Sequence, residues 1–595
     1  MATATGSDAN GIPIQQPKPR NPNPQALRAY HEDATLAPSP TPSSDPGTPG
    51  PGTPTNAPPS VKATSSARKQ VRAEQKRGFP RIQYAARVSH FDPRSEYANF
   101  RGFFVLFWIA LTIMVLTTAL RNLKETGYPL SMRQWGLFTK NIYEMAVIDL
   151  VMVASTGISL PLNLMYKNSK GWLQWERQGM AVQSIFQAFW LLLWVSWPFL
   201  RDWTWTAQVF FTLHLLVMFM KMHSYAFYNG HLANTLHRLS ALDDPAANTS
   251  TAAAVKYPSS QTPIADIGDK LEEEETAEAD SVTQLRDDLA MELVSPFGRL
   301  TYPQNLTAAN YVDFLLCPTL CYELEYPRTS SRSYLEIFWK TLAVVGCIFL
   351  LTITSEEFII PVLDESAERL EHQHNWQEGS LVFAETVSRL LFPFMVAFLL
   401  VFLVIFEYLL GAFAEITCFA DRQFYSDWWN SLDWLEFSRE WNVPVHHFFR
   451  RHVYSASRNT MSRPVATFIT FLVSSIAHEL VMGCITRKFR GYGFVAMMLQ
   501  MPIVLVQRSP WIRNRTILNN VLFWCSMILG LSMVSLILFF SDPVWTNADP
   551  VADVRLVRSL VDVVVDAVRS FGSSIGHSPL PDFTAQFWRG LTIPS

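Results

Sequence analysis

Long apolar runs are the feature that most limits what this chain can fold into. The hydrocarbon core of a bilayer is about 30 Å thick and a helix rises about 1.5 Å per residue, so roughly 20 apolar residues can cross it. Apolar residues make up 49% of the 595 residues and are gathered in such runs. We therefore predict an all-α, polytopic transmembrane helical bundle of about nine spans, near residues 102–120, 145–165, 181–200, 206–225, 336–356, 389–409, 465–486, 494–507 and 518–540.

The first 93 residues have a different composition. They are rich in Pro, Ser, Thr, Ala and Gln and poor in large apolar side chains, so burial cannot offset the entropy cost of ordering them. We expect a disordered tail over residues 1–93 and a transmembrane catalytic domain over residues 94–545. Basic residues dominate the stretch 62–101, which places the N-terminus in the cytosol by the positive-inside rule. The alternative is a solvated basic linker without lipid contact.

Charge also assigns three segments beyond the tail. Residues 240–298 include the acidic run 272–275, and we expect a disordered acidic insertion in the cytosol. Residues 410–464 carry several arginines and form the cytosolic motif region of the predicted topology. An odd number of spans then leaves residues 546–595 in the lumen, where valines at near-helical spacing over 551–571 are compatible with an amphipathic helix.

Familiar soluble-enzyme motifs are absent from the sequence. There is no nucleophile elbow, no Walker loop, no dinucleotide-binding glycine fingerprint and no zinc-protease helix. The six cysteines lie mostly inside or beside apolar runs and lack the paired spacing of a zinc site or a disulfide framework. We expect reduced, packed thiols, no metal and no resident cofactor. We also expect no nucleic-acid partner.

Chemistry-bearing residues gather between the sixth and eighth apolar runs. His478 interrupts an apolar helix, and a polar group at membrane depth is a functional candidate by default. An imidazole can take a proton from a hydroxyl that attacks a carbonyl and return it to the leaving group. A neutral amide such as Asn442 can donate to the developing oxyanion without bringing a charge into low dielectric. These residues predict acyl transfer, for which a thioester donor needs no covalent enzyme intermediate.

The most distinctive stretch is the aromatic motif, by which we mean residues 424–430. It reads Phe-Tyr-Xaa-Asp-Trp-Trp-Asn and includes Phe424, Tyr425, Asp427, Trp428, Trp429 and Asn430. Each candidate has a structural alternative. His478 could be a core histidine satisfied by a neighbouring carbonyl, and the acid and tryptophans of the motif could form a helix cap and an interfacial aromatic belt.

The aromatic motif, the stretch 441–446 and the stretch 474–479 resemble the membrane-bound O-acyltransferase superfamily. The resemblance is to the branch that contains sterol O-acyltransferases and type 1 diacylglycerol acyltransferases, and it covers roughly residues 95–545. The stretches 220–225 and 318–328 are also typical of that branch. The stretches 419–422, 451–454 and 498–502 look most like the fungal steryl-ester-forming enzymes.

This resemblance implies a helical bundle around a reaction chamber, with coenzyme A entering from the cytosol and the acceptor from the bilayer. It implies that His478 is the catalytic base, that Asn442 rather than Asn430 is its partner, and that Glu479 supports the histidine. It also implies acyl-CoA contacts at Arg439, His446, Tyr454 and Ser474. We interpret Arg439 and Arg451 as phosphate contacts, with a plain positive-inside role as the alternative for each.

The implied activity is that of a sterol O-acyltransferase. It would move a long-chain fatty acyl group from acyl-CoA to the 3-hydroxyl of a membrane sterol, with ergosterol expected from the fungal likeness. The resemblance also implies a multi-pass location in the endoplasmic reticulum membrane and a homodimer or homotetramer. Two alternatives stay open at this point: a diacylglycerol O-acyltransferase making triacylglycerol, and a lipid or sterol transporter, for which no internal repeat is visible.

Overall fold

The computed structural model describes residues 82–92, 95, 101–130, 136, 140, 142–201, 203–243, 285–371, 376–486, 489–509, 512 and 515–540. All of them lie in the second of the two compact units of the chain, Ala73–Ser595. The predicted tail up to residue 81, the insertion from 244 to 284 and the C-terminal segment 546–595 lie outside the described residues.

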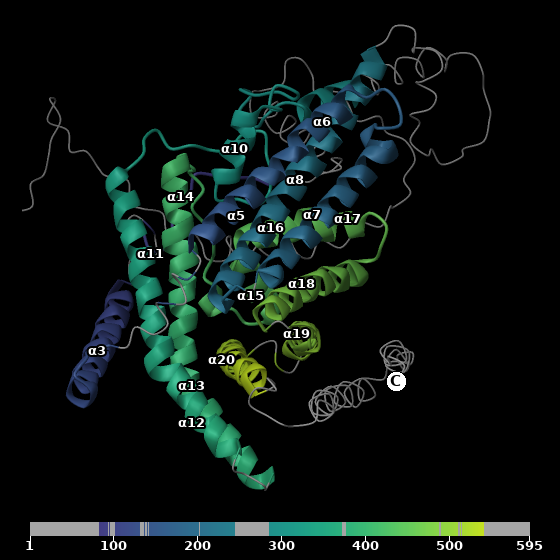
Figure 1. Cartoon of the computed structure of the whole chain (residues 1–595). Coiled ribbons are helices and arrows are strands. Elements are labelled where there is room, and N and C mark those ends of the chain that lie inside the picture. The colour runs from purple at the N-terminus through teal and green to yellow at the C-terminus, as the bar shows by residue number, and fades with distance from the viewer. Residues whose placement is uncertain are drawn as a thin grey trace, which may run out of the picture. The chain divides into compact units, whose positions relative to one another are not determined.

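The described part of the chain is helical, with only isolated β-bridges beside the helices, so the all-α fold class is confirmed (Figure 1). Seven helices in this part are long and apolar enough to cross a membrane. They coincide with the first seven predicted spans and are Gly102–Thr126, Ile142–Asn168, Trp175–Leu200, Thr206–Leu242, Tyr334–Leu370, Gln377–Thr417 and Arg463–Cys484.

The last two predicted spans differ from the other seven. Helix α19 (Tyr492–Gln507) has 16 residues, or roughly 24 Å at 1.5 Å per residue, which is short for the hydrocarbon core. Helix α20 (Thr516–Phe540) has 25 residues. The part of it with described side chains that counts as an apolar helix is Thr516–Gly530, which is too short to be included among the seven. Figure 1 shows both helices end-on, beside long helices that run across the view.

Several helices continue well past their predicted ends. Helix α8 spans Trp205–Asp243, although the apolar run ends near residue 225. A polar residue near that end is satisfied inside the protein: the buried Lys221 ammonium donates to Phe314 O at 3.0 Å and to Cys317 O at 2.7 Å. These carbonyls close helix α10 (Ala308–Leu316), where a cation offsets the helix dipole. A buried polar group with partners does not end a helix.

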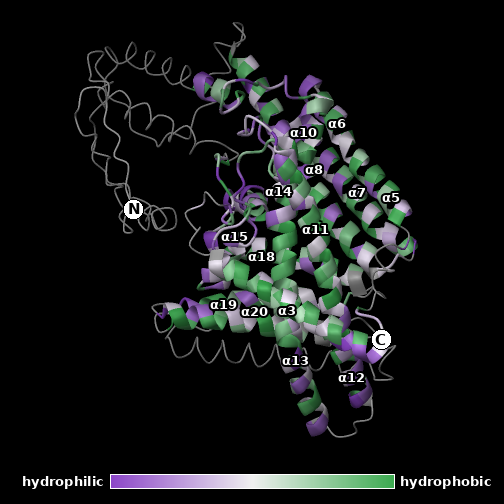
Figure 2. Cartoon of the chain, turned by 90° about the vertical axis from the view of Figure 1, so that its left-hand side faces the viewer, coloured by the Kyte–Doolittle hydropathy of each residue, from purple (hydrophilic) through white to green (hydrophobic). Residues whose placement is uncertain are grey.

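Two spans are continuous helices that contain a π-helical turn. The fifth span joins α11 (Tyr334–Thr354), η5 (Ser355–Ile359) and α12 (Ile360–Glu371). The sixth joins α13 (Trp376–Phe402), η6 (Leu403–Leu409) and α14 (Leu410–Thr417). The two spans pack side by side, and Figure 2 shows hydrophilic residues at the ends of α12 and α13 farthest from α14.

The remaining long helices complete the bundle. The second span comprises α5 (Ile142–Ser155), the 3₁₀ turn η2 (Thr156–Ile158) and α6 (Ser159–Asn168). The third comprises η3 (Trp175–Gly179) and α7 (Met180–Leu200). Both spans pack against α8. Helix α18 (Arg463–Thr486) packs against α8 and α19, which places the segment carrying His478 beside the centre of the bundle.

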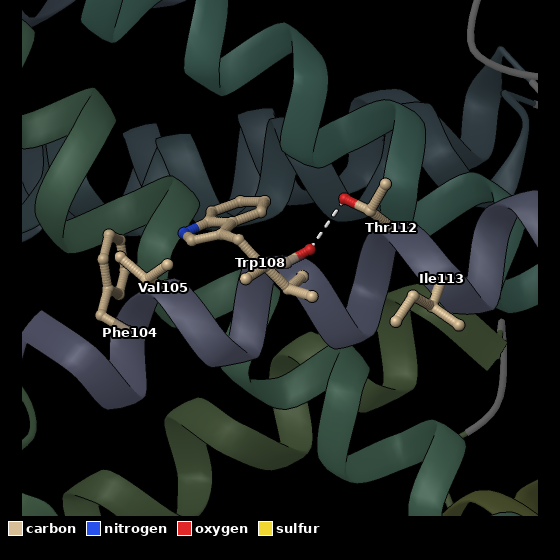
Figure 3. Close-up of a pocket in the computed structure, with 6 residues that line it drawn as sticks. Phe104, Val105, Trp108, Thr112 and Ile113 are labelled. Atoms are coloured by element: carbon tan, nitrogen blue, oxygen red, sulfur yellow. Dashed lines mark hydrogen bonds between the residues drawn. The ribbon is translucent and has the colours of Figure 1, made fainter.

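Helix α3 (Arg101–Thr126) presents mostly apolar side chains outward. Phe103 is 70% exposed and Leu120 is 68% exposed, as expected of side chains that face lipid. A shallow groove of about 340 Å³ runs along this helix, and none of the predicted site residues lines it (Figure 3). It is lined by Phe104, Val105, Trp108, Ile109, Thr112 and Ile113.

Two described segments fall inside ranges predicted to be disordered. Residues 285–292 are helical, and Glu292 accepts a hydrogen bond from His231 Nε2 of α8 at 2.9 Å. Residues 82–92, which we call the strap, are held by the folded domain: Ile82 N donates to Glu323 Oε1 at 3.2 Å, and Arg87 pairs with Asp421 at 2.7 Å. The folded domain therefore begins before residue 94, because these polar contacts hold the strap and because Ile82, Tyr84 and Phe91 pack against apolar clusters of the core.

Candidate functional site

Three aromatic side chains of the motif are buried in the protein core. Phe424, Tyr425 and Trp428 are 3%, 1% and 1% exposed. Trp428 is part of the turn η7 (Trp428–Asn430), and the Asp427 side chain makes no cap hydrogen bond there. The alternative of an interfacial belt with a helix cap is therefore wrong for Asp427 and Trp428. The motif is a structural centre on which neighbouring segments pack.

The backbone of the motif holds the chain on both sides of Asn442. Ser426 N donates to Glu440 O at 2.8 Å, and Val443 N donates to Phe424 O at 3.0 Å. The indole of Trp441, between these two bonds, stacks on Phe398 with ring centroids 4.6 Å apart. The backbone around Asn442 is thus held by Ser426 and Phe424, which lie 16 and 18 positions earlier in the chain.

Asn442 caps helix α16 (Val443–Phe448). Its Oδ1 accepts a hydrogen bond from Val445 N at 3.1 Å, the usual contact of an N-cap residue. A backbone N–H can only donate, so this bond identifies the oxygen of the amide and leaves its NH₂ group facing the other way. The oxygen of Asn442 therefore stabilises the helix, and the two N–H donors of its amide take no part in the cap.

Two substitutions can separate the role of Asn442 as a helix cap from its role as an N–H donor. Asn442→Asp keeps an oxygen for Val445 N but removes both N–H donors, so we expect a folded protein whose acyl-transfer rate falls about 10²–10³-fold. Asn442→Ala removes the cap as well and should lower the free energy of unfolding by about 1 kcal/mol. Steady-state rates and melting temperatures of the two variants check this. An Asn442→Asp enzyme as active as wild type would contradict the donor role.

His478 lies on α18 with an exposed ring. Its Nδ1 lies 2.8 Å from Ser474 O. A carbonyl oxygen can only accept, so Nδ1 carries the proton and, in the neutral ring, Nε2 has the free lone pair. This is the tautomer that a general base requires. The structural alternative is met in one part, because a neighbouring carbonyl satisfies Nδ1, and not in the other, because the ring is exposed and lies outside the core.

Glu479 makes contacts with helix α19. Its Oε1 accepts from Gly491 N at 2.7 Å and its Oε2 accepts from Phe494 N at 3.1 Å. Gly491 is the N-cap of α19 with φ of 81°, a conformation that favours glycine. A carboxylate at a helix N-terminus is stabilised by the free N–H groups and the dipole. The carboxylate therefore joins α18 to α19 one residue beyond His478.

The four predicted acyl-CoA contacts lie on neighbouring elements. Arg439 is on α15 (Trp434–Glu440), His446 is on α16, and Tyr454 ends η8 (Phe449–Tyr454). Helix α18, which carries Ser474, packs against η8, and α15 packs against α16. Helix α16 continues into η8, which packs against α18. The described residues show no hydrogen bond between His478 and Asn442.

The surroundings of α16 are electropositive. Burial, together with nearby His447, Arg439 and Arg450, lowers the pKa of His446 to about 4. Burial and then the charge of Arg508 lower the pKa of Arg439. The positive neighbours of His446 favour an anion such as a nucleotide phosphate, whereas Arg439 also has the carboxyls of Asp433, Glu436 and Glu440 nearby. His446 is neutral at physiological pH and can offer a hydrogen bond but no charge.

Arg451 does not fit its prediction as a phosphate contact. It is 2% exposed and donates to Glu323 Oε1 at 2.6 Å and to Tyr322 O at 3.0 Å. Its guanidinium also lies over the Tyr228 ring, 4.8 Å from the centroid. Sequence reasoning assigned it by charge alone, whereas this arginine is buried and paired. It joins η8 to the segment before α11.

Contacts between the strap and the motif are absent from the sequence prediction. Ser89 Oγ donates to Glu407 Oε2 at 2.5 Å, and Tyr425 OH donates to the same oxygen at 3.1 Å. The His90 ring lies 5.3 Å from the Tyr425 ring. The Arg87 guanidinium binds both oxygens of Asp421, three residues before the motif. The only signal in the sequence was a cluster of aromatic and basic residues just before the first span.

We expect Arg87→Ala to loosen the strap. Asp421 is 3% exposed, and losing a bidentate charged partner of this kind costs about 1.5–3 kcal/mol. Amide hydrogen exchange over residues 82–92 should become roughly ten- to hundred-fold faster. Gln83→Ala, which changes an exposed side chain of the same strap, is the matched control. Equal exchange in both variants would mean that the ion pair does not hold the strap.

Comparison with known proteins identifies the family. Residues 184–540 match the family profile described as MBOAT, membrane-bound O-acyltransferase family. The chain belongs to this family. The resemblance stated from the motifs is confirmed, and the buried aromatic motif, Asn442 and His478 all lie within the matched residues of this membrane-bound O-acyltransferase.

Individual relatives carry more specific names. A Schizosaccharomyces pombe protein described as probable sterol O-acyltransferase 2 is 38% identical over 445 residues, which are 73% of this chain and 86% of the relative. Sterol O-acyltransferase 2 of Candida albicans is 31% identical over 485 residues, 77% of this chain and 78% of the relative. Diacylglycerol O-acyltransferase 1 of Dictyostelium discoideum is 32% identical over 264 residues, 43% of this chain and 42% of the relative.

Proposed function

We propose that this membrane-bound O-acyltransferase transfers a long-chain fatty acyl group from acyl-CoA to the 3-hydroxyl of a membrane sterol, forming a steryl ester and free CoA. Acyl transfer follows from the family. The sterol acceptor is supported by fungal relatives named sterol O-acyltransferase, which align over most of the chain. The match to a diacylglycerol O-acyltransferase covers 43% of the chain, which makes that acceptor the second candidate.

The observation that carries the mechanism is the hydrogen bond from His478 Nδ1 to Ser474 O, at 2.8 Å. It leaves Nε2 to take the proton of the sterol hydroxyl. The hydroxyl oxygen then forms a bond to the thioester carbonyl carbon, and the bond from that carbon to sulfur breaks. The imidazolium returns its proton to the departing thiolate, so one proton moves from sterol to CoA and His478 is regenerated.

Asn442 serves the same reaction from the other side. Its NH₂ group donates to the carbonyl oxygen of the thioester, which gains negative charge in the transition state. The neutral amide is suited to this role because it brings no charge into low dielectric. Arg439 and His446 are proposed to contact the CoA portion, with Tyr454 and Ser474 nearer the thioester.

The location and assembly are proposed from the family likeness. A multi-pass membrane protein follows from the seven apolar helices and the family. We extend this to the endoplasmic reticulum membrane, with the N-terminus in the cytosol, and to a homodimer or homotetramer. Ergosterol is the proposed sterol because the relatives named sterol O-acyltransferase are fungal proteins.

The test uses membranes from cells that lack endogenous esterification and express this chain. They receive labelled oleoyl-CoA with either ergosterol or diacylglycerol, and the lipid products are separated. Labelled steryl ester that depends on this chain supports the proposal. Triacylglycerol as the main product would keep the mechanism and replace the acceptor, and no labelled ester from either acceptor would overturn the proposed function.

A further inference from the structure

Helix α20 reaches the aromatic motif with side-chain hydrogen-bond donors. Asn520 Nδ2 donates to Trp429 O at 3.0 Å and to Ser431 O at 3.1 Å. Trp524 Nε1, one helical turn later, donates to Trp429 O at 3.1 Å. Neither residue belongs to the motifs that the sequence analysis identified. Their contacts lie at the C-terminal end of the motif, opposite the end that holds Asn442.

The chemistry of this contact is specific to an amide and an indole. The NH₂ group of Asn520 has two hydrogens, and it serves two carbonyls that are two residues apart. Trp429 O uses both of its lone pairs, one for Asn520 and one for Trp524. The turn η7 is only three residues long, so its last carbonyls lack helical partners and need donors from elsewhere. Helix α20 supplies them.

A series of hydrogen bonds connects the residues that α20 contacts to the backbone beside Asn442. Asn430 N donates to Asp427 O at 2.9 Å and Ser431 N donates to Trp428 O at 3.1 Å, which stiffens the turn. At the other end, Phe424 and Ser426 bond the backbone on either side of Asn442. Ser431 Oγ adds a bond to the Glu440 carboxyl at 3.3 Å.

Aromatic packing supports the same path. Trp428 lies 5.6 Å from the Trp524 ring on one side and 4.9 Å from the Trp441 ring on the other, measured between centroids. Trp441 directly precedes Asn442. Large rigid rings in a close-packed core resist displacement. A shift of α20 therefore reaches Asn442 by hydrogen bonds and by packing.

We propose that Asn520, assisted by Trp524, is a positioning residue that sets the Asn442 amide for acyl transfer. The inference rests on the proposed function, in which Asn442 donates to the thioester carbonyl. Asn520 acts through the motif and does not touch the substrate. A misplacement of about 1 Å in a catalytic group can cost about 10²-fold in rate, so loss of the α20 contacts lowers kcat far more than it changes substrate binding.

The experiment compares Asn520→Asp and Trp524→Phe with Ser526→Ala. Asn520→Asp keeps the size but replaces both donors by an acceptor, and Trp524→Phe removes a single N–H. Ser526 lies on the same helix, and its hydroxyl donates to Phe523 O of α20 at 2.9 Å. We expect kcat to fall roughly 10- to 100-fold in Asn520→Asp and less in Trp524→Phe, with KM for oleoyl-CoA within about two-fold of wild type. Ser526→Ala should keep wild-type kinetics.

A double variant separates positioning from general destabilisation. If Asn520 acts through Asn442, Asn520→Asp should cause little further loss in an Asn442→Asp background. Hydrogen exchange of peptides covering 424–445 should rise in Asn520→Asp, while peptides of α8 stay unchanged. If Asn520→Asp does not fold, the same measurements are made on Trp524→Phe. Additive losses in the double variant, or wild-type kcat in both single variants, would overturn the proposal.

The outcomes also distinguish this inference from the proposed function. If Asn442→Asp is impaired and both α20 variants are fully active, only the positioning role of Asn520 fails. If wild-type protein forms no steryl ester, or Asn442→Asp is fully active, the proposed function of the site fails first.

Discussion

Replacing His478 with alanine is expected to lower steryl-ester formation about 10²–10⁴-fold, the range typical for loss of a general base. The Nε2 lone pair left by the Nδ1 contact to Ser474 O is the only base that the proposed mechanism uses. The ring is exposed, so its loss removes little packing and the variant should fold. Initial rates with labelled oleoyl-CoA at saturating sterol measure the effect.

Thr470→Ala is the matched control for His478→Ala. Thr470 lies two turns earlier on α18, and its hydroxyl donates to Ala466 O of the same helix at 2.8 Å. Both variants should have the same melting temperature as wild type. Activity of His478→Ala within a few-fold of the control would remove His478 from the mechanism.

Breaking the buried pair between Arg451 and Glu323 is expected to have the largest effect on stability. Both side chains are 1% exposed and their atoms are 2.6 Å apart. Arg451→Met leaves the Glu323 carboxylate buried without its partner, which costs about 3–5 kcal/mol in such cases. The melting temperature in detergent and the yield of folded protein should both fall strongly.

Two further variants identify the cause. Arg451→Met combined with Glu323→Leu removes both charges and should recover part of the lost stability, because an apolar pair needs no solvation. Arg369→Ala removes an exposed arginine that bonds Glu385 at 2.8 Å and should leave the melting temperature unchanged. If Arg451→Met has the same melting temperature as wild type, the ion pair contributes nothing to stability.

Helix α8 illustrates how far apolar periodicity can predict the fold. The apolar run located the helix near residues 206–225, but the helix continues to Asp243. Lys221 and Asn229 are polar, yet both are buried with partners: Lys221 on carbonyls that close α10, and Asn229 on Asn305 Nδ2 at 2.7 Å. Those partners are about 75–95 residues away in sequence, so a local pattern cannot include them.

The strap is a segment that was predicted to be disordered and is ordered in the structure. It lies within residues 1–93, whose overall composition predicts disorder because large apolar side chains are few. It is held instead by a bidentate ion pair with Asp421 and by bonds to Glu407 and Glu323. The partners come from positions more than 200 residues away. The average composition of the tail also hides the few apolar side chains of the strap, such as Tyr84 and Phe91, which pack on the core beside these polar contacts.

The sequence alone was sufficient to predict those features that depend on the residues of a single segment. The apolar runs predicted the spans, and an imidazole within one of them marked His478. Tertiary structure decided the relations between segments: that the aromatic motif is a buried support for Asn442, that Arg451 is a core ion pair, and that Asn520 reaches the motif from the last helix. Hydrophobic periodicity acts along the chain and can be read from it, but hydrogen bonds and ion pairs between distant segments exist only once packing has brought their partners within about 3 Å of each other.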